Sequence, residues 1–187
     1  MMSYFINIDG LVELEQQERW EEARELLYKI WESDKLNSGK LIRLLSECWQ
    51  VLSLWDCCIK NESLSFQVFQ DTLIECTKFG LKNFNDDSRF LCVTGYMISI
   101  LPYLFVVQGT EALYTEWEQK GVDMLSRAYE LDPNDKVAEI LNLGRTSEFF
   151  EYNKALESIT PELTTLFPWE TYVDVYFKDI LSIRYTN

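Results

Sequence analysis

Histidine, the side chain most often used as a general base or metal ligand near neutral pH, is absent from this chain of 187 residues. Without histidine the chain cannot build Ser-His or Cys-His nucleophiles or most zinc sites. The adjacent carboxylates Asp86-Asp87 remain as an acid–base candidate, but paired acids before an apolar run more often cap a helix and offset its dipole. The sequence therefore predicts no catalytic residue, no metal site and no cofactor, and hence a protein that is not an enzyme.

Three further motifs have the wrong spacing for chemistry. Asp132-Pro133-Asn134-Asp135 lacks the glycine and glutamate of a calcium loop, so it predicts a turn between helices. Ser38-Gly39-Lys40 lacks the upstream glycine and the following hydroxyl residue of a phosphate loop. The vicinal Cys57-Cys58 lacks the spacing of redox and zinc motifs. We expect all five cysteines to be reduced and most of them to be buried. They are Cys48, Cys57, Cys58, Cys76 and Cys92.

The charge of the chain is strongly one-sided, with 31 acidic and 17 basic side chains and a net charge of −14. Such a charge repels nucleic-acid phosphates and anionic lipids and attracts basic protein surfaces. From Glu148 to Asp179 there are seven acids and two bases, whereas from Asn37 to Gln108 the counts are seven and six. One explanation for this excess of acidic side chains is that it only keeps the protein soluble. Because uncompensated charge also costs stability, we favour the other, which is capture of a basic partner.

The elements that carry these charges are predicted to be helices. Apolar residues make up 47% of the chain, and with only 7 Gly and 4 Pro it has few turn residues for an all-β fold. Asn, Asp or Ser residues that could cap a helix recur at three joints, 34–38, 85–88 and 132–135. These joints are roughly fifty residues apart, which is typical of stacked helical hairpins. We therefore expect one all-α domain, 1–187, of antiparallel hairpins that form an array or an irregular bundle. The expected hairpin units are 1–35, 36–84, 85–133 and 134–187. Apolar residues at helical spacing support these units in 20–31, 41–55, 66–80 and 114–131.

The uncharged run Phe90–Thr110 is almost long enough to span a membrane. Its polar residues and the lack of a second such run favour an enclosed central helix instead. Cys92, Gly95 and Ser99 fall at helical spacing, so one side of this helix is small enough for a neighbouring backbone to approach. We expect core positions in this run, namely Leu91, Ile98 and Leu101.

The C-terminal segment and the N-terminal residues support two separate predictions, one about structure and one about location. Residues 168–185 fit either a helix with Pro168 in its first turn or an alternating strand. A lone strand would have no partner, so we favour the helix. The start, Met1-Met2-Ser3-Tyr4-Phe5, lacks the basic and apolar regions of a secretion signal, which predicts a cytoplasmic protein.

Two segments resemble the second helix of a tetratricopeptide repeat. Gly121-x-x-x-Leu125-x-x-Ala128-Tyr129-Glu130-Leu131-Asp132-Pro133 has the small residue, the alanine and the closing proline of that helix, and 19–27 is similar. The family's Trp, Leu-Gly and Tyr positions fall on Phe105, Gln108-Gly109 and Ala112, so the first helices depart from the pattern. The hairpins are also longer than the family's repeat of about 34 residues. The resemblance covers about a fifth of the chain and implies tetratricopeptide-like packing with a concave binding surface.

These features together predict a non-enzymatic protein that binds a basic protein. In size, acidity and helical content the chain is similar to immunity proteins and antitoxins, which neutralise basic nuclease toxins. An adaptor or chaperone for peptide segments is an alternative, as is a regulator that senses a peptide or small ligand. We expect the partner-binding surface in the C-terminal third, on Glu148, Glu151, Tyr152, Trp169, Glu170, Tyr172, Asp174 and Asp179. Two alternatives remain: Trp169 and Tyr172 cap the last hydrophobic layer, or the surface lies around Glu15, Glu18 and Glu22.

Overall fold

The computed structural model describes residues 3–56, 64–106 and 113–183, and these residues fold as helices with no strand. The all-α prediction is therefore confirmed. The vicinal Cys57-Cys58, the end of the uncharged run and the last residues of 168–185 lie outside the described residues. The elements are α1 (Leu11–Gln16), α2 (Trp20–Glu32), α3 (Ser38–Ser53), α4 (Phe66–Asn83), α5 (Ser88–Ile100), η1 (Pro102–Phe105), α6 (Leu113–Leu131), α7 (Lys136–Leu143), α8 (Phe149–Ile159), η2 (Thr160–Glu162), α9 (Leu163–Leu166) and α10 (Tyr172–Ile180).

The three predicted joints each start a helix with a side-chain cap. Asn37 and Asp87 accept a hydrogen bond from the backbone N–H three residues further on, at the starts of α3 and α5. Asp135 accepts from two backbone N–H groups at the start of α7. Each cap satisfies donors that have no partner within the helix. The turn chemistry in the sequence thus located three helix starts correctly.

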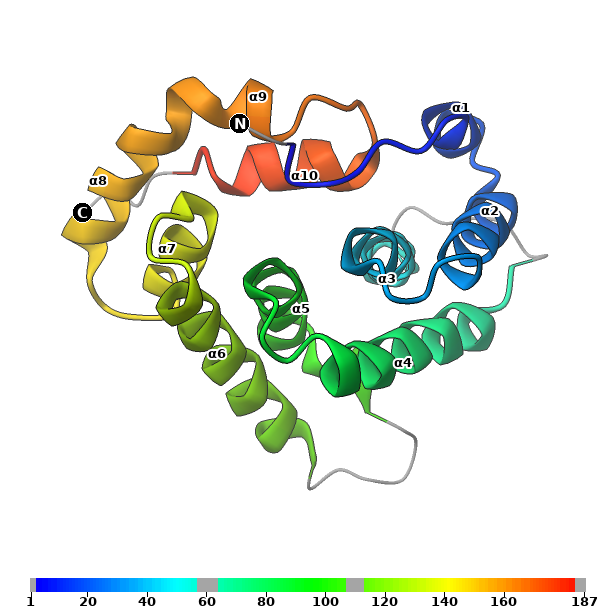
Figure 1. The fold of residues 1–187 in the computed structure, drawn as a ribbon, viewed down its shortest axis with the longest axis horizontal. Coiled ribbons are helices and arrows are strands. Elements are labelled where there is room, and N and C mark those ends of the chain that lie inside the picture. Colours follow the sequence, from blue (N-terminus) through cyan, green and yellow to red (C-terminus); the bar gives the residue numbers. More distant parts are fainter. Residues whose placement is uncertain (1–2, 57–63, 107–112, 184–187) are drawn as a thin grey trace.

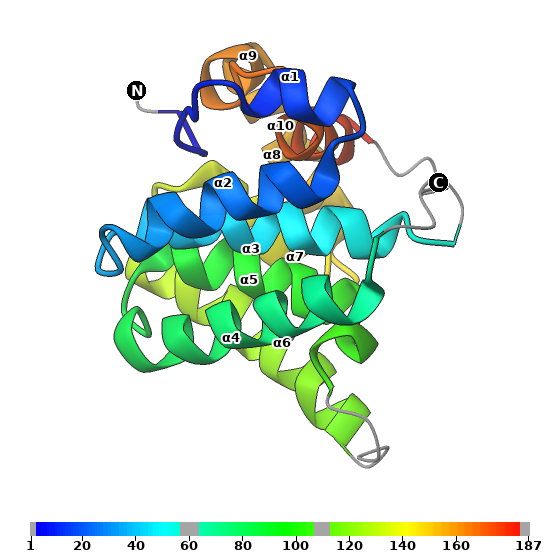
Figure 2. The same cartoon turned by 90° about the vertical axis from the view of Figure 1, so that its right-hand side faces the viewer.

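The helices enclose α3 and α5, as Figure 1 shows, with α2, α4, α6, α7 and α10 around them. Seen from the side, α2, α3 and α4 stack below the layer that holds α1, α9 and α10 (Figure 2). The two ends of the described chain meet in that layer. The Tyr4 backbone N–H donates to the Leu166 carbonyl at 2.6 Å, and the Trp169 indole N–H donates to the Phe5 carbonyl at 3.1 Å. Of the two architectures that the sequence left open, the contacts between the ends favour a closed bundle.

Helix α3 is enclosed on most sides, because every residue from Leu41 to Leu52 is buried. In the sequence its polar residues form only a narrow stripe of Arg43, Glu47, Gln50 and Ser53, which predicts such coverage, and the structure confirms it. The stripe itself is also enclosed: Arg43 and Glu47 are each only 1% exposed. Charged side chains are almost never buried without partners, so these two residues point to a polar cluster inside the bundle.

Helices α5 and α6 cross at two glycines. A Cβ atom on Gly121 would lie 2.6 Å from the backbone nitrogen of Ser99 and 2.8 Å from the carbonyl oxygen of Gly95. Real Cβ atoms do not approach other atoms so closely, so both positions need small residues. The predicted close approach of a neighbouring backbone to α5 is confirmed.

The uncharged run differs from the expectation in its length. Helix α5 ends at Ile100, and η1 begins at Pro102. Proline disfavours helical backbone in the residue before it and supplies no N–H, which explains the early end. Ile98 is buried as expected, whereas Leu101 lies beyond the helix and is only half-buried. Among the described helices, none combines the length and the apolar character that crossing a membrane requires.

The C-terminal segment contains the favoured helix, but it starts later than predicted. Helix α10 begins at Tyr172, and the Thr171 side chain caps it by accepting from the backbone N–H of Asp174. Pro168 therefore precedes the cap and is not in the first turn. The hydroxyl of Thr171 provides a stronger helix start than proline alone because it satisfies a backbone donor.

Candidate binding site

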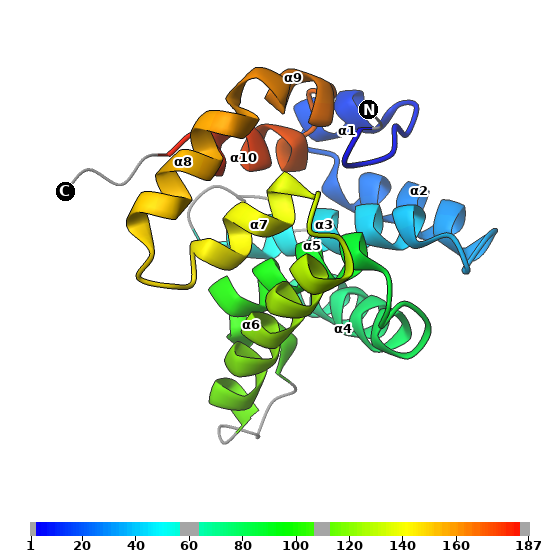
Figure 3. The same ribbon diagram turned by 60° about the vertical axis from the view of Figure 1, so that its left-hand side comes forward.

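The predicted acidic surface is divided by the fold. Glu148 and Glu151 are exposed at the start of α8, beside two exposed aromatic side chains, Phe149 (48% exposed) and Phe150 (78%). Figure 3 shows α8 at the outside of the bundle, next to α7 and α10. Tyr152 belongs to the same helix, but its side chain is 8% exposed and faces inward. Glu170 and Asp179 are exposed on other elements.

Trp169 and Tyr172 join the two ends of the chain. The half-buried Trp169 donates to the Phe5 carbonyl, as described above, and the Tyr172 ring packs edge-on against Trp20 with centroids 5.2 Å apart. The Tyr172 backbone N–H donates to the Glu15 carboxylate at 2.7 Å. Both aromatic residues thus pack on the last hydrophobic layer, although the Tyr172 side chain remains 41% exposed.

Asp174 is placed in the interior, with a side chain that is fully buried. Its carboxylate accepts from the Arg43 guanidinium at 2.9 Å and from the Thr171 hydroxyl. Burial raises the pKa of Asp174, and the Arg43 charge and the hydroxyl oppose that rise. Asp174 is therefore not available to a partner at the surface, because it is the counter-ion of a buried arginine.

A second pair of carboxyl groups lies in the same buried cluster. Glu15 on α1 and Glu47 on α3 are each 1% exposed and are close enough to influence each other's ionisation. Burial, reinforced by the neighbouring Glu47, raises the pKa of Glu15 to about 9, and burial also raises the pKa of Glu47. At neutral pH the pair holds a proton. The cluster links α1, α3 and α10 in the core. The sequence did not predict it, because Glu15 was expected to be one of the surface acids near the N-terminus.

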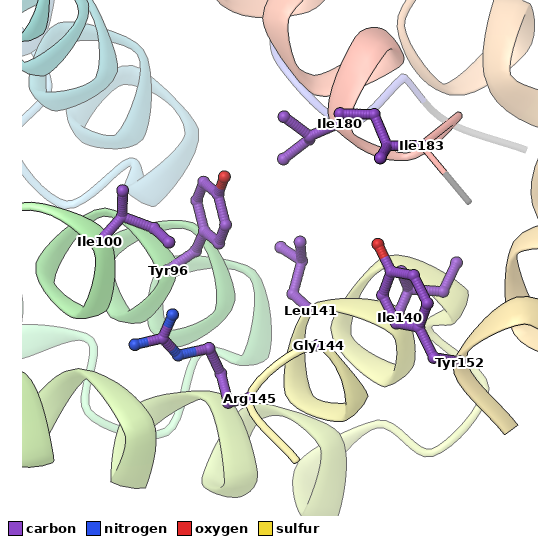
Figure 4. A pocket seen from close by; sticks show the side chains of 9 residues that line it. All are labelled: Tyr96, Ile100, Ile140, Leu141, Gly144, Arg145, Tyr152, Ile180 and Ile183. Atoms are coloured by element: carbon purple, nitrogen blue, oxygen red, sulfur yellow. The ribbon is translucent and has the colours of Figure 1, made fainter. Parts of the chain in front are cut away.

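A pocket opens between α5, α7, α8 and the end of α10, with a volume of about 190 Å³ (Figure 4). Its floor is apolar and buried, and Ile100 and Ile183 form exposed parts of its rim. Of the predicted site residues, Tyr152 lines this pocket. The full lining comprises Tyr96, Ile100, Ile140, Leu141, Gly144, Arg145, Tyr152, Ile180 and Ile183.

The pocket contains a few polar groups on an apolar background. Arg145 donates to the Ser99 carbonyl at 2.9 Å and lies 4.0 Å from the Glu118 carboxylate. The hydroxyl groups of Tyr96 and Tyr176 are hydrogen-bonded at 2.7 Å. Burial raises the pKa of Tyr96, so its hydroxyl stays protonated. A single arginine in the loop after α7 carries no sequence signal for a site, which is why the sequence did not predict this pocket.

Metal chemistry has no support among the described residues, because no cluster of three or more Cys, Asp or Glu side chains there could hold an ion. Comparison of the chain with protein families, curated sequences and solved structures gives no match. Function is therefore inferred from the chemistry of the surface and of the pocket.

Proposed function

We propose that this protein binds a basic protein partner through the exposed surface at the start of α8, and that it does so without catalysis. The observation that supports this proposal is the exposed pair Phe149 and Phe150 between Glu148 and Glu151. Large aromatic side chains supply most of the energy at protein interfaces once they are desolvated, and surrounding charges set the rate and the choice of partner.

The charge of the whole chain supports the same proposal. A net charge of −14 accelerates encounters with a basic surface and slows encounters with nucleic acid. Near Phe150, Lys154 is paired with Glu151 at 3.8 Å, so these two charges largely offset each other, and Glu148 adds a further negative charge to this surface. A partner with an apolar anchor ringed by Lys and Arg fits these properties.

Within this class we propose the role of a toxin-neutralising immunity protein. Nuclease toxins carry basic surfaces to hold phosphates, and an acidic inhibitor pairs with the same groups. The support is the acidity, the size and the exposed aromatic anchor. A basic nuclease domain encoded by the neighbouring reading frame would agree with this role; a neighbour without one would favour the adaptor alternative.

The test starts from the partner that copurifies with the protein from its native host, identified by mass spectrometry. Phe150→Ala should weaken its binding by about tenfold or more, because an anchor contributes ~1–2 kcal/mol or more. Tyr114→Ala is the matched control, since Tyr114 is a 44% exposed aromatic residue on α6.

Charge reversal tests the steering separately. Glu148→Lys with Glu151→Lys should slow association and flatten its salt dependence. The control, Glu32→Lys with Glu116→Lys, makes the same charge change at exposed positions on α2 and α6. Equal effects of both double variants would show that only total charge matters and would contradict a binding surface on α8.

A further inference from the structure

We infer that the pocket between α5, α7, α8 and α10 binds a compact monocarboxylate with an aromatic or branched apolar body, held by Arg145. This inference goes beyond the proposed protein binding and does not rest on it. It assigns the pocket an anionic small-molecule ligand, which the acidity of the chain does not suggest.

The size and lining of the pocket set the apolar part of the ligand. A buried cavity of about 150 Å³ lined by apolar side chains can hold benzene, and this pocket measures about 190 Å³. Its floor, Ile140 and Leu141, is at most 6% exposed, and Figure 4 shows Ile180 and Ile183 on the opposite side. Ligand pockets generally combine such walls with a small number of oriented polar groups. A phenyl or isobutyl group fits this space.

The charge of the side chains that line the pocket determines the polar group of the ligand. Among the described residues that line the pocket, Arg145 is the one charged side chain. Its guanidinium carries five N–H donors, of which the bond to the Ser99 carbonyl uses one. Figure 4 shows the guanidinium on the same side of the pocket as Tyr96. A planar fork of this kind binds a carboxylate in a bidentate manner.

Tyrosine hydroxyl groups add neutral donors to this arginine. The hydrogen bond between Tyr96 and Tyr176 uses one of their two hydroxyl protons, so the pair retains a second proton to donate. In the described part of the lining these donors occur without a negative group, which favours an anion over a cation or an amide.

Glu118 competes with such a ligand for Arg145. Its carboxylate is 4.0 Å from the guanidinium, and its side chain is 46% exposed. Glu118 shares the neighbouring surface hollow with Arg145 and does not line the pocket itself. Salt largely screens charges that lie more than about 8 Å away, so a carboxylate as close as that of Glu118 has the strongest effect. Removing the Glu118 charge should therefore strengthen the binding of a carboxylate.

The test is a titration of isotope-labelled protein, followed by NMR, with phenylacetate, isovalerate and neutral 2-phenylacetamide, each up to about 10 mM. At least one of the two carboxylates should shift the amide signals of Gly144, Arg145 and Ile183, and the amide should shift them far less. Arg145→Gln keeps a donor for the Ser99 carbonyl but removes the charge, and it should weaken carboxylate binding by about tenfold or more.

Glu118→Gln should tighten carboxylate binding by about two- to threefold. Glu116→Gln, the same charge change at an exposed position on α6, should leave it unchanged. The comparison of these two glutamate variants tests the proposal even if the Arg145→Gln variant does not fold. Equal binding of 2-phenylacetamide and the carboxylates would overturn it, as would equal effects of the two glutamate variants or an absence of shifts at the pocket.

Discussion

Most substitutions in a protein core lower stability, but the buried pair Glu15 and Glu47 predicts the opposite effect for one of them. Replacement of Glu15 by glutamine should stabilise the protein at neutral pH. The glutamine is nearly the same shape, its carbonyl can accept from the Tyr172 backbone N–H as the carboxylate does, and its amide can donate to Glu47. It removes an ionisable group from a site that opposes ionisation.

The magnitude follows from proton linkage. The pKa of Glu15 is raised from 4.5 to about 9 in the folded protein, so between these values the folded state binds more protons than the unfolded chain. Stability therefore falls as pH rises through this window, by up to about 1.4 kcal/mol for each pH unit. At pH 7 the cost reaches at most ~3 kcal/mol, and we expect Glu15→Gln to recover about 1–3 kcal/mol of it.

Urea unfolding followed by tryptophan fluorescence at about pH 5.5, 7 and 8.5 measures this effect. The gain from Glu15→Gln should be small at the lowest pH and largest at the highest. Glu170→Gln, at an exposed position, is the control and should change stability by less than about 0.5 kcal/mol. A Glu15→Gln variant that is less stable than the parent at high pH, or that keeps the full pH slope, would refute the reasoning.

Three further predictions concern the packing. Asp174→Ala should lower the free energy of unfolding by about 3–5 kcal/mol, measured by urea titration, because it removes the carboxylate that is hydrogen-bonded to the buried Arg43 guanidinium. Gly121→Ala should lower the melting temperature in calorimetry, at a cost of ~1–3 kcal/mol, since its Cβ would overlap the backbone of α5; an unchanged melting temperature would contradict the crossing. Ile98→Ala should cost about 2–5 kcal/mol in the same urea assay and Leu101→Ala less, because only Ile98 is fully buried.

Several parts of the fold could be predicted from local sequence because their causes are local. The cap residues Asn37, Asp87 and Asp135 bind backbone groups two or three residues away, so the turn chemistry is visible in the sequence. The spacing of Gly95 and Ser99 predicted the close helix contact in the same way. The helix boundaries were less accurate where proline acted: the helix that contains Ile98 ends before Pro102, and α10 begins after Pro168.

The candidate sites were less predictable because they depend on burial. Glu151 and Asp174 are both acids in amphipathic segments, yet one is exposed on α8 and the other is fully buried. The charged residues Arg43 and Glu47, in a helix with many apolar residues, were the available signal of buried polar partners. No periodic pattern identifies Arg145, because it lies in a loop and lines its pocket through the packing of several helices.

The sequence by itself determined the helical class, several helix starts and the negative charge that favours a basic partner. These properties depend on neighbours in the chain or on composition, and both are fixed before folding. Only the tertiary structure decided which acids are buried, where the chain ends meet and where the pocket lies. The reason is that each depends on residues far apart in sequence: Arg43 and Asp174 are 131 residues apart, and Trp169 meets Phe5 across 164 residues.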